Sequence, residues 1–304
     1  MIVLIRGQVN IMGKVLSLDI GASSIKSGLV DINGNISEEK RTVLKEETYS
    51  GFIDTVKSIM AGLDEKPAGI AAALPGGYDI EKDEIFAPNL NILNGKHIRT
   101  DLESIFNIKV LAENDANLAA YGEYVFGDKK SVKNMVFCTL GSGFGGGLIL
   151  NGKLLQSNIT LFEIGHLSID FHGRQCGCGR RGCLDEYCST GGLKEIYKNI
   201  TGKEINPVQL GELASSGDIH ALEAFREYGR LLAGAFANIS ALFCPEKIKF
   251  GGGLSELAEY YIQPMEEEFN NIIFPAYKGR VKIERAALKN QAGMAGGAAL
   301  FFGL

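Results

Sequence analysis

A chain of 304 residues is long enough for two domains, and its 45% hydrophobic and 22% charged content is typical of a globular protein. Its formal net charge of −5, without a basic cluster, argues against a nucleic-acid partner. No apolar run reaches the roughly eighteen residues of a membrane span, and the segment before Lys14 is too short for a signal peptide. The six cysteines are too few for a disulfide scaffold, so we expect a cytoplasmic protein, with Met12 as an alternative start.

The first half of the chain predicts alternating strands and helices. Strands are expected over 14–20 and 25–31, with a short turn at 21–24 and a hairpin turn over 31–35. Apolar residues at helical spacing predict a helix over 49–63, and a buried strand over 69–77 ends at Pro75 and two glycines. A helix over 101–106, a strand over 109–112 and a helix over about 114–124 follow.

The second half repeats this order. A strand over 134–140, a glycine turn over 141–147 and a returning strand over 148–155 are expected. Apolar residues every three or four positions predict one long helix over 222–243. Pro245 follows it, and a strand over 247–250 enters Gly251–Gly253. The Ala- and Gly-rich tail over 293–300 predicts a closely packed last helix. The pattern predicts an α/β protein with two sheet-containing domains and a cleft between them.

Two glycine-containing turns are candidate phosphate sites. In DIGASS (19–24) a strand ends in Asp19, a residue that could hold Mg²⁺, before small residues that let backbone N–H groups approach phosphate oxygens. LGSGFGGG (140–147) is richer in glycine, and Ser142 adds a hydroxyl. Neither is a Walker-type loop or a dinucleotide fingerprint, and either turn could be purely structural.

Asp115 stands at a strand-to-helix junction in AENDANLAA (112–120), a place from which a carboxylate can project as a general base. Asn114 or Asp115 could instead cap the helix that follows, and position alone favours capping.

Cys176, Cys178 and Cys183 follow His166 in the chain. Three thiolates and one imidazole form a closed tetrahedral ligand set for structural Zn²⁺, and the intervening glycines let a loop wrap round an ion. His172 is a competing ligand.

These segments together resemble the ROK family (repressors, open reading frames and sugar kinases). The resemblance rests on DIGASSIKSGLVD, PNL, ENDANLAA, TLGSGFGGGL, EIGH, CGCGRRGCLDEYCS and FGGGLSE, in the expected order from about Lys14 to the C-terminus. His166 followed by CGCGRRGC is the most specific part.

The resemblance implies a hexokinase/actin-like ATPase fold with the active site in the interdomain cleft. Its smaller domain would span 12–118 plus a C-terminal helix over about 290–304, and its larger domain 119–289. Asp115 matches the catalytic aspartate. Sugar-binding positions would be Gly77, Asn89, Asn114, Asp115, Glu163, His166 and Asp185. ATP and phosphate positions would be Asp19, Gly21, Ser23, Lys26, Thr139, Gly141, Ser142, Gly143, Gly251 and Gly252. The zinc ligands would be His166, Cys176, Cys178 and Cys183.

The sequence departs from the family pattern in three of its motifs. Ala22 and Ser23 replace the usual Gly-Thr of the first phosphate turn, and Ser23 keeps the hydroxyl. Asp185 stands where the family usually has a glutamate that binds sugar hydroxyls, and Glu186 could substitute only if the backbone shifted. Phe144 replaces Ile or Val, which we expect to be a packing change.

The resemblance implies transfer of the γ-phosphoryl group of MgATP to a sugar hydroxyl, most simply C6 of glucose. N-acetylmannosamine kinase or another hexose or hexosamine kinase is the alternative, and polyphosphate is an alternative donor. The family also contains sugar-responsive repressors, which are not enzymes. The sequence pattern also allows a catalytically inactive, sugar-binding regulatory protein. The short segment before the first strand argues against a repressor. A homodimer is also implied.

Overall fold

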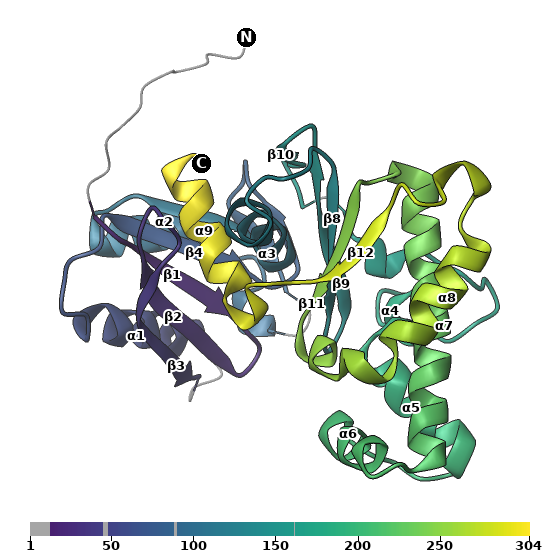
Figure 1. Ribbon diagram of the computed structural model, residues 1–304. Coiled ribbons are helices and arrows are strands. Elements are labelled where there is room, and N and C mark those ends of the chain that lie inside the picture. Colours follow the sequence, from purple (N-terminus) through teal and green to yellow (C-terminus); the bar gives the residue numbers. More distant parts are fainter. Residues whose placement is uncertain (1–12, 45–47, 88–89, 161) are drawn as a thin grey trace. The chain divides into compact units, whose positions relative to one another are not determined.

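The computed structural model describes residues 13–44, 48–87, 90–160 and 162–304 (Figure 1). These residues form two compact units, each with its own five-stranded sheet. The first contains the described residues up to Leu118 together with Gly293–Leu304, and the second contains Ala119–Ala292. None of the helices described is both long and apolar enough to cross a membrane.

The first unit contains the sheet β3-β2-β1-β4-β7, in which β1, β4 and β7 are parallel and β2 and β3 are antiparallel. Its elements are β1 (Val15–Ile20), β2 (Ser24–Val30), β3 (Ile36–Val43), α1 (Tyr49–Ala61), β4 (Gly69–Leu74), the hairpin β5 (Gly77–Asp79) and β6 (Glu84–Phe86), the 3₁₀ turn η1 (Asn91–Leu93), α2 (Ile98–Phe106), β7 (Val110–Asn114) and the start of α3 (Asp115–Gly122).

The last helix, α9 (Ala292–Phe302), packs closely against this sheet, as the Ala- and Gly-rich sequence predicts. A Cβ on Gly69 would lie 2.3 Å from the Phe301 ring, and one on Gly297 would lie 2.9 Å from Cβ of Ala71. Small residues are therefore required where helix and sheet meet. Apolar side chains of α1 and α2, among them Phe52, belong to the separate core cluster of this sheet.

The second unit contains the sheet β10-β9-β8-β11-β12, in which β8, β11 and β12 are parallel. Its elements are the π-helix η2 (Glu123–Gly127), β8 (Met135–Leu140), β9 (Phe144–Leu150), β10 (Lys153–Leu154), η3 (Ile164–His166), α4 (Asp185–Cys188), α5 (Thr190–Thr201), α6 (Pro207–Ser215), α7 (Ile219–Phe243), β11 (Lys247–Gly251), η4 (Gly253–Tyr260), α8 (Ile262–Ile272), η5 (Pro275–Tyr277), β12 (Lys282–Arg285) and η6 (Lys289–Gln291).

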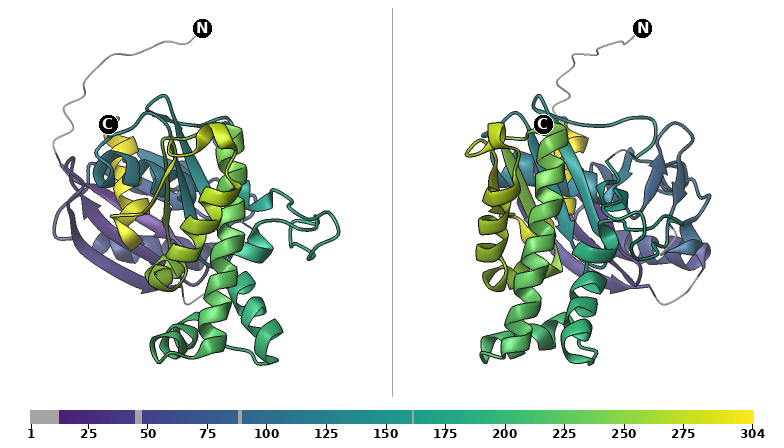
Figure 2. Two further views of the ribbon diagram at one scale, coloured as in Figure 1. Left: turned by 45° about the vertical axis from the view of Figure 1, so that its right-hand side comes forward. Right: turned by 90° about the vertical axis from the view of Figure 1, so that its right-hand side faces the viewer.

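Helix α7 organises the core of the second unit. It lies beside α5 and α8 (Figure 2) and buries Phe225, Leu232 and Phe236, as its apolar spacing predicts. Tyr228 packs edge-on against Tyr261 with ring centroids 5.1 Å apart.

Two predictions of element boundaries were wrong. The returning strand after the glycine turn begins at Phe144 rather than at 148, because Gly145–Gly147 pair with β8 as ordinary strand residues. The helix predicted to reach about 124 ends at Gly122 and continues as a π-helix to Gly127. Glu123 in that π-helix is fully buried and binds groups distant in sequence, which local helical spacing does not reveal.

Candidate functional site

The predicted site residues of the first unit gather at the carboxyl ends of its parallel strands. The register pairs Asp19 with Ala73, and Leu74 with Asn114. The turn after β1, the glycines after β4 and the start of α3 therefore lie at one edge of the sheet, where α/β proteins bind ligands.

The first turn has the tight geometry that its sequence predicts. The N–H of Gly21 donates to the carbonyl of Ser24 over 3.0 Å, which leaves Ser23 exposed at the tip. Asp19 lies at the end of β1, and Lys26 Nζ contacts its Oδ2 at 3.1 Å. The turn and the strand residues beside it therefore present a hydroxyl, a cation and a carboxylate, which are group types found at phosphate and metal sites.

Asn114, rather than Asp115, caps helix α3. Its Oδ1 accepts the N–H of Asn117 at 3.0 Å, and its Nδ2 donates to the carbonyl of Gly76 at 2.9 Å. The half-buried Asp115 accepts the N–H of Ala116 at 2.8 Å. Of the two residues that could cap the helix, Asn114 fills that role.

The phosphate-turn candidates of the second unit lie side by side. Gly251 pairs with Thr139 at the ends of β11 and β8. Gly252 has a φ of +90°, and a Cβ there would lie 2.6 Å from the carbonyl oxygen of Leu140. Between β8 and β9 only Gly141–Gly143 form the turn, closed by Gly141 N–H donating to Gly143 O over 3.0 Å. Ser142 is exposed at its tip.

Three residues predicted to bind sugar also belong to the second unit, and one of them contacts the end of this turn. Asp185, at the start of α4, accepts the N–H of Phe144 at 2.5 Å. Glu163 directly precedes the short 3₁₀ turn η3, and His166 is the last residue of that turn. Burial raises the pKa of Glu163 above its ordinary value even though part of its side chain is exposed; His166 opposes the shift and Asp185 adds to it.

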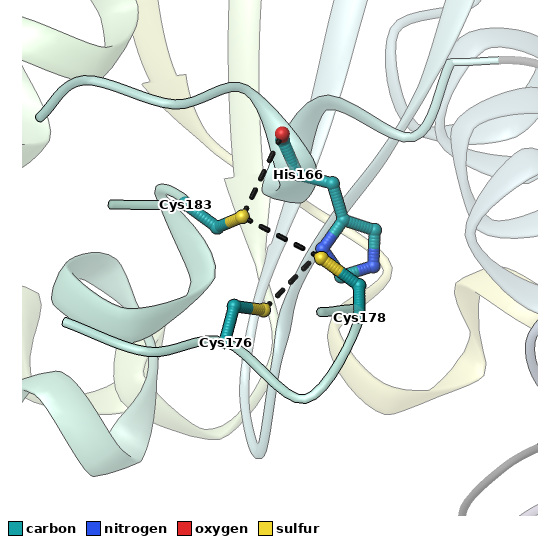
Figure 3. A group of neighbouring side chains, drawn as sticks. All are labelled: His166, Cys176, Cys178 and Cys183. Atoms are coloured by element: carbon teal, nitrogen blue, oxygen red, sulfur yellow. Dashed lines mark hydrogen bonds between the residues drawn. The ribbon is translucent and has the colours of Figure 1, made fainter. Parts of the chain in front are cut away.

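His166, Cys176, Cys178 and Cys183 converge on one point (Figure 3), with donor atoms all within 4.8 Å of one another. Cys178 Sγ lies 3.7 Å from Cys183 Sγ, and Cys176 Sγ lies 3.7 Å from His166 Nδ1. A tetrahedral ion with Zn–S bonds of about 2.3 Å places two sulfurs about 3.8 Å apart, so these residues fit zinc. His166 is the histidine in this group. The competing candidate, His172, does not belong to it.

Burial raises the pKa of the Cys176 thiol, so an ion would have to displace a tightly held proton. The donor set is complete at four protein ligands, the arrangement typical of structural zinc.

One predicted sugar-binding residue, Asn89, lies outside the described residues, and one backbone contact of the glycine turn was not predicted. The residue that the sequence analysis missed is Thr190, whose N–H donates to the carbonyl of Gly141 at 2.8 Å. The helix-capping serine before it was the available signal, because it marks the start of α5.

Comparisons with known proteins identify the family of this chain. The ROK family profile matches residues 15–303. The N-acetyl-D-glucosamine kinase of Salmonella paratyphi B is 31% identical over 297 residues, covering 93% of this chain and 97% of that protein. The glucokinase of Streptomyces coelicolor is 30% identical over 313 residues, covering 95% of this chain and 98% of that protein.

Among solved structures, the ROK family glucokinase of Streptomyces griseus in complex with glucose and AMPPNP matches with a TM-score of 0.83 and 29% identity. The match covers 95% of this chain and 99% of that chain. The predicted hexokinase/actin-like class, with two α/β domains, is therefore confirmed. The chain belongs to the ROK family.

Proposed function

We propose that this chain, an ATP-dependent sugar kinase, transfers the γ-phosphoryl group of MgATP to the C6 hydroxyl of glucose with Asp115 as general base. The observation that carries the proposal is that the two neighbouring residues at the start of α3 differ in role. Asn114 caps the helix and binds Gly76, so Asp115 is not needed as the cap. The names of the similar proteins, which include a glucokinase with bound glucose and AMPPNP, support the reaction class.

Asp115 accepts the proton of the attacking hydroxyl, while positioning and charge neutralisation supply most of the acceleration. The residues that bind the sugar hydroxyls in this proposal are Gly77, Asn89, Asn114, Glu163 and His166. Mg²⁺, when bound, neutralises charge on the phosphate oxygens.

The turns supply the phosphate contacts. Gly21 leaves room for the phosphate, Ser23 donates its hydroxyl, and Lys26, which pairs with Asp19, balances phosphate charge. Asp19 would hold the metal ion. In the second unit Thr139 and the turn Gly141–Gly143 receive the phosphates, and Gly251 and Gly252 adjoin the adenosine.

The proposal includes a structural zinc ion held by His166 and the three cysteines, which would keep the loop 176–183 folded beside Asp185. It also includes a homodimer, which light scattering coupled to size-exclusion chromatography would test.

A coupled ADP-release assay with MgATP tests the reaction against glucose, N-acetylglucosamine, N-acetylmannosamine, mannose, fructose and allose. Asp115→Ala should lower kcat by about 10²–10⁴-fold. Asp54→Asn, at an exposed aspartate of α1, is the matched control and should leave kcat unchanged. Turnover of an N-acetylhexosamine but not of glucose would show that the N-acetylhexosamine is the substrate. Replacing ATP by polyphosphate tests the identity of the phosphate donor.

Sugar binding without turnover by any member of the panel, in protein that is folded and carries metal, would overturn the kinase. It would favour a sugar-binding regulatory protein instead. Equal kcat in Asp115→Ala and the unmodified chain would overturn the role of Asp115.

A further inference from the structure

The backbone of Phe144 is held from two sides at the end of the glycine turn. Its N–H donates to Asp185 Oδ1 over 2.5 Å. Its carbonyl oxygen lies so close to Gly165 that a Cβ there would be 1.9 Å away. Because Phe144 directly follows Gly143, fixing its backbone fixes the outgoing end of the turn.

The incoming end is held by the same stretch of chain. Thr190 N–H donates to the carbonyl of Gly141 at 2.8 Å, only five residues after Asp185. The Asp185 carboxylate also lies against the turn, because a Cβ on Gly143 would be 2.9 Å from Oδ1. A side chain at position 143 would therefore displace the carboxylate from its present place.

We propose that Asp185 is a positioning residue for the phosphate turn Gly141–Gly143, and that the segment 183–190 holds this turn in the shape that binds the phosphates of ATP. This inference rests on the proposed kinase function. A carboxylate would repel phosphate oxygens on direct contact, so Asp185 acts through the N–H of Phe144. Binding of sugar hydroxyls by the same carboxylate is the competing role.

Asp185→Ala removes the acceptor and leaves the Phe144 N–H without it. Loss of a hydrogen bond to a charged group corresponds to an increase of about tenfold or more in Kd. We therefore expect the Kd for Mg-AMPPNP, measured by calorimetry without sugar, to rise at least about tenfold. Asp185→Asn keeps an oxygen acceptor and should recover the affinity to within about fivefold of the unmodified chain.

In the kinase assay the KM for ATP should rise with Asp185→Ala while the KM for sugar changes by less than about threefold. A merely structural defect would reduce the active fraction and leave both KM values in place. A rise confined to the KM for sugar, with AMPPNP binding intact, would overturn the proposal in favour of the competing role.

Thr190→Pro tests the other end of the turn. Thr190 is the first residue of α5, a position where proline is favoured, and Ser189 before it has the extended backbone that proline requires. The variant therefore removes the N–H to Gly141 while keeping the helix. Ile219→Pro, at the exposed first residue of α7, is the matched control.

We expect Thr190→Pro to weaken AMPPNP binding by a few fold or more, and Ile219→Pro to leave it unchanged. Equal affinity in both variants would contradict the positioning role of segment 183–190. Failure of the kinase proposal would look different, because the unmodified chain would then turn over no sugar or fail to bind AMPPNP at all.

Discussion

Removing one partner of the buried ion pair between Glu123 and Lys249 should strongly destabilise the second unit. Glu123 is fully buried, and its carboxylate accepts from Lys249 Nζ at 2.9 Å, Ala287 N at 2.8 Å and Leu288 N at 3.0 Å. Lys249 Nζ also lies 3.5 Å from Asp128 Oδ1. The pair therefore joins the π-helix, strand β11 and the segment after β12.

Lys249→Met keeps the length of the side chain and removes its charge, which leaves the buried Glu123 carboxyl group without its cation. Breaking a buried pair in this way costs about 3–5 kcal/mol. With a shift of roughly 2–4 °C per kcal/mol for a unit of this size, Tm should fall by roughly 6–20 °C. Lys57→Met, which breaks the exposed pair with Asp54, is the control and should cost less than about 1 kcal/mol.

Differential scanning calorimetry and urea unfolding measure both changes. A double-mutant cycle with Glu123→Gln isolates the pair, and we expect a coupling energy above about 1 kcal/mol. This account would be refuted if Lys249→Met lowered the free energy of unfolding no more than Lys57→Met does. It would also be refuted if the effects of Lys249→Met and Glu123→Gln were additive.

Three further outcomes are expected. Gly252→Ala should lower the free energy of unfolding in urea by at least about 1–3 kcal/mol, because a φ of +90° with a ψ of 178° is essentially restricted to glycine. Gly253→Ala is the control, since a Cβ there would meet no described atom within 4 Å. Equal losses in the two variants would contradict backbone strain at Gly252. Burial and the bond to Asp83 raise the pKa of Tyr78, so its contribution to stability is complete below its unfolded pKa of about 10 and is lost as pH rises toward the folded value. The urea midpoint should therefore fall between pH 9 and 11, less steeply in Tyr78→Phe. Cys183→Ser should reduce bound zinc, measured by elemental analysis, from one equivalent to a small fraction and lower Tm; purified unmodified protein without zinc would contradict the site.

The elements that the sequence predicted correctly are those with strong local signals. Helix α7 has apolar residues at helical spacing over its whole length, and β4 is an uninterrupted buried run between clear breakers. The convergence of His166 with Cys176, Cys178 and Cys183 was predicted from the close spacing of the three cysteines in the sequence.

Features that the sequence could not predict depend on contacts between distant residues. The choice of Asn114 as the helix cap is tied to its bond with the Gly76 carbonyl, 38 residues away. Asp185 and Phe144 are 41 residues apart, and Glu123 and Leu288 are 165 apart. No local pattern encodes such pairings, because each depends on the register of strands and the path of loops.

The position of the motifs along the chain nevertheless has a physical meaning. In the first unit β1, β4 and β7 are adjacent and parallel, so residues that follow each strand meet at one edge although they are far apart in sequence. In the second unit the pairing of β8 with β11 brings the glycines after each strand together in the same way. Sheet topology therefore brings the candidate residues of each unit together. Within each unit, long-range hydrogen bonds then distinguish neighbouring residues, as when Asn114 caps the helix beside Asp115 and Asp185 binds the backbone beside Gly143.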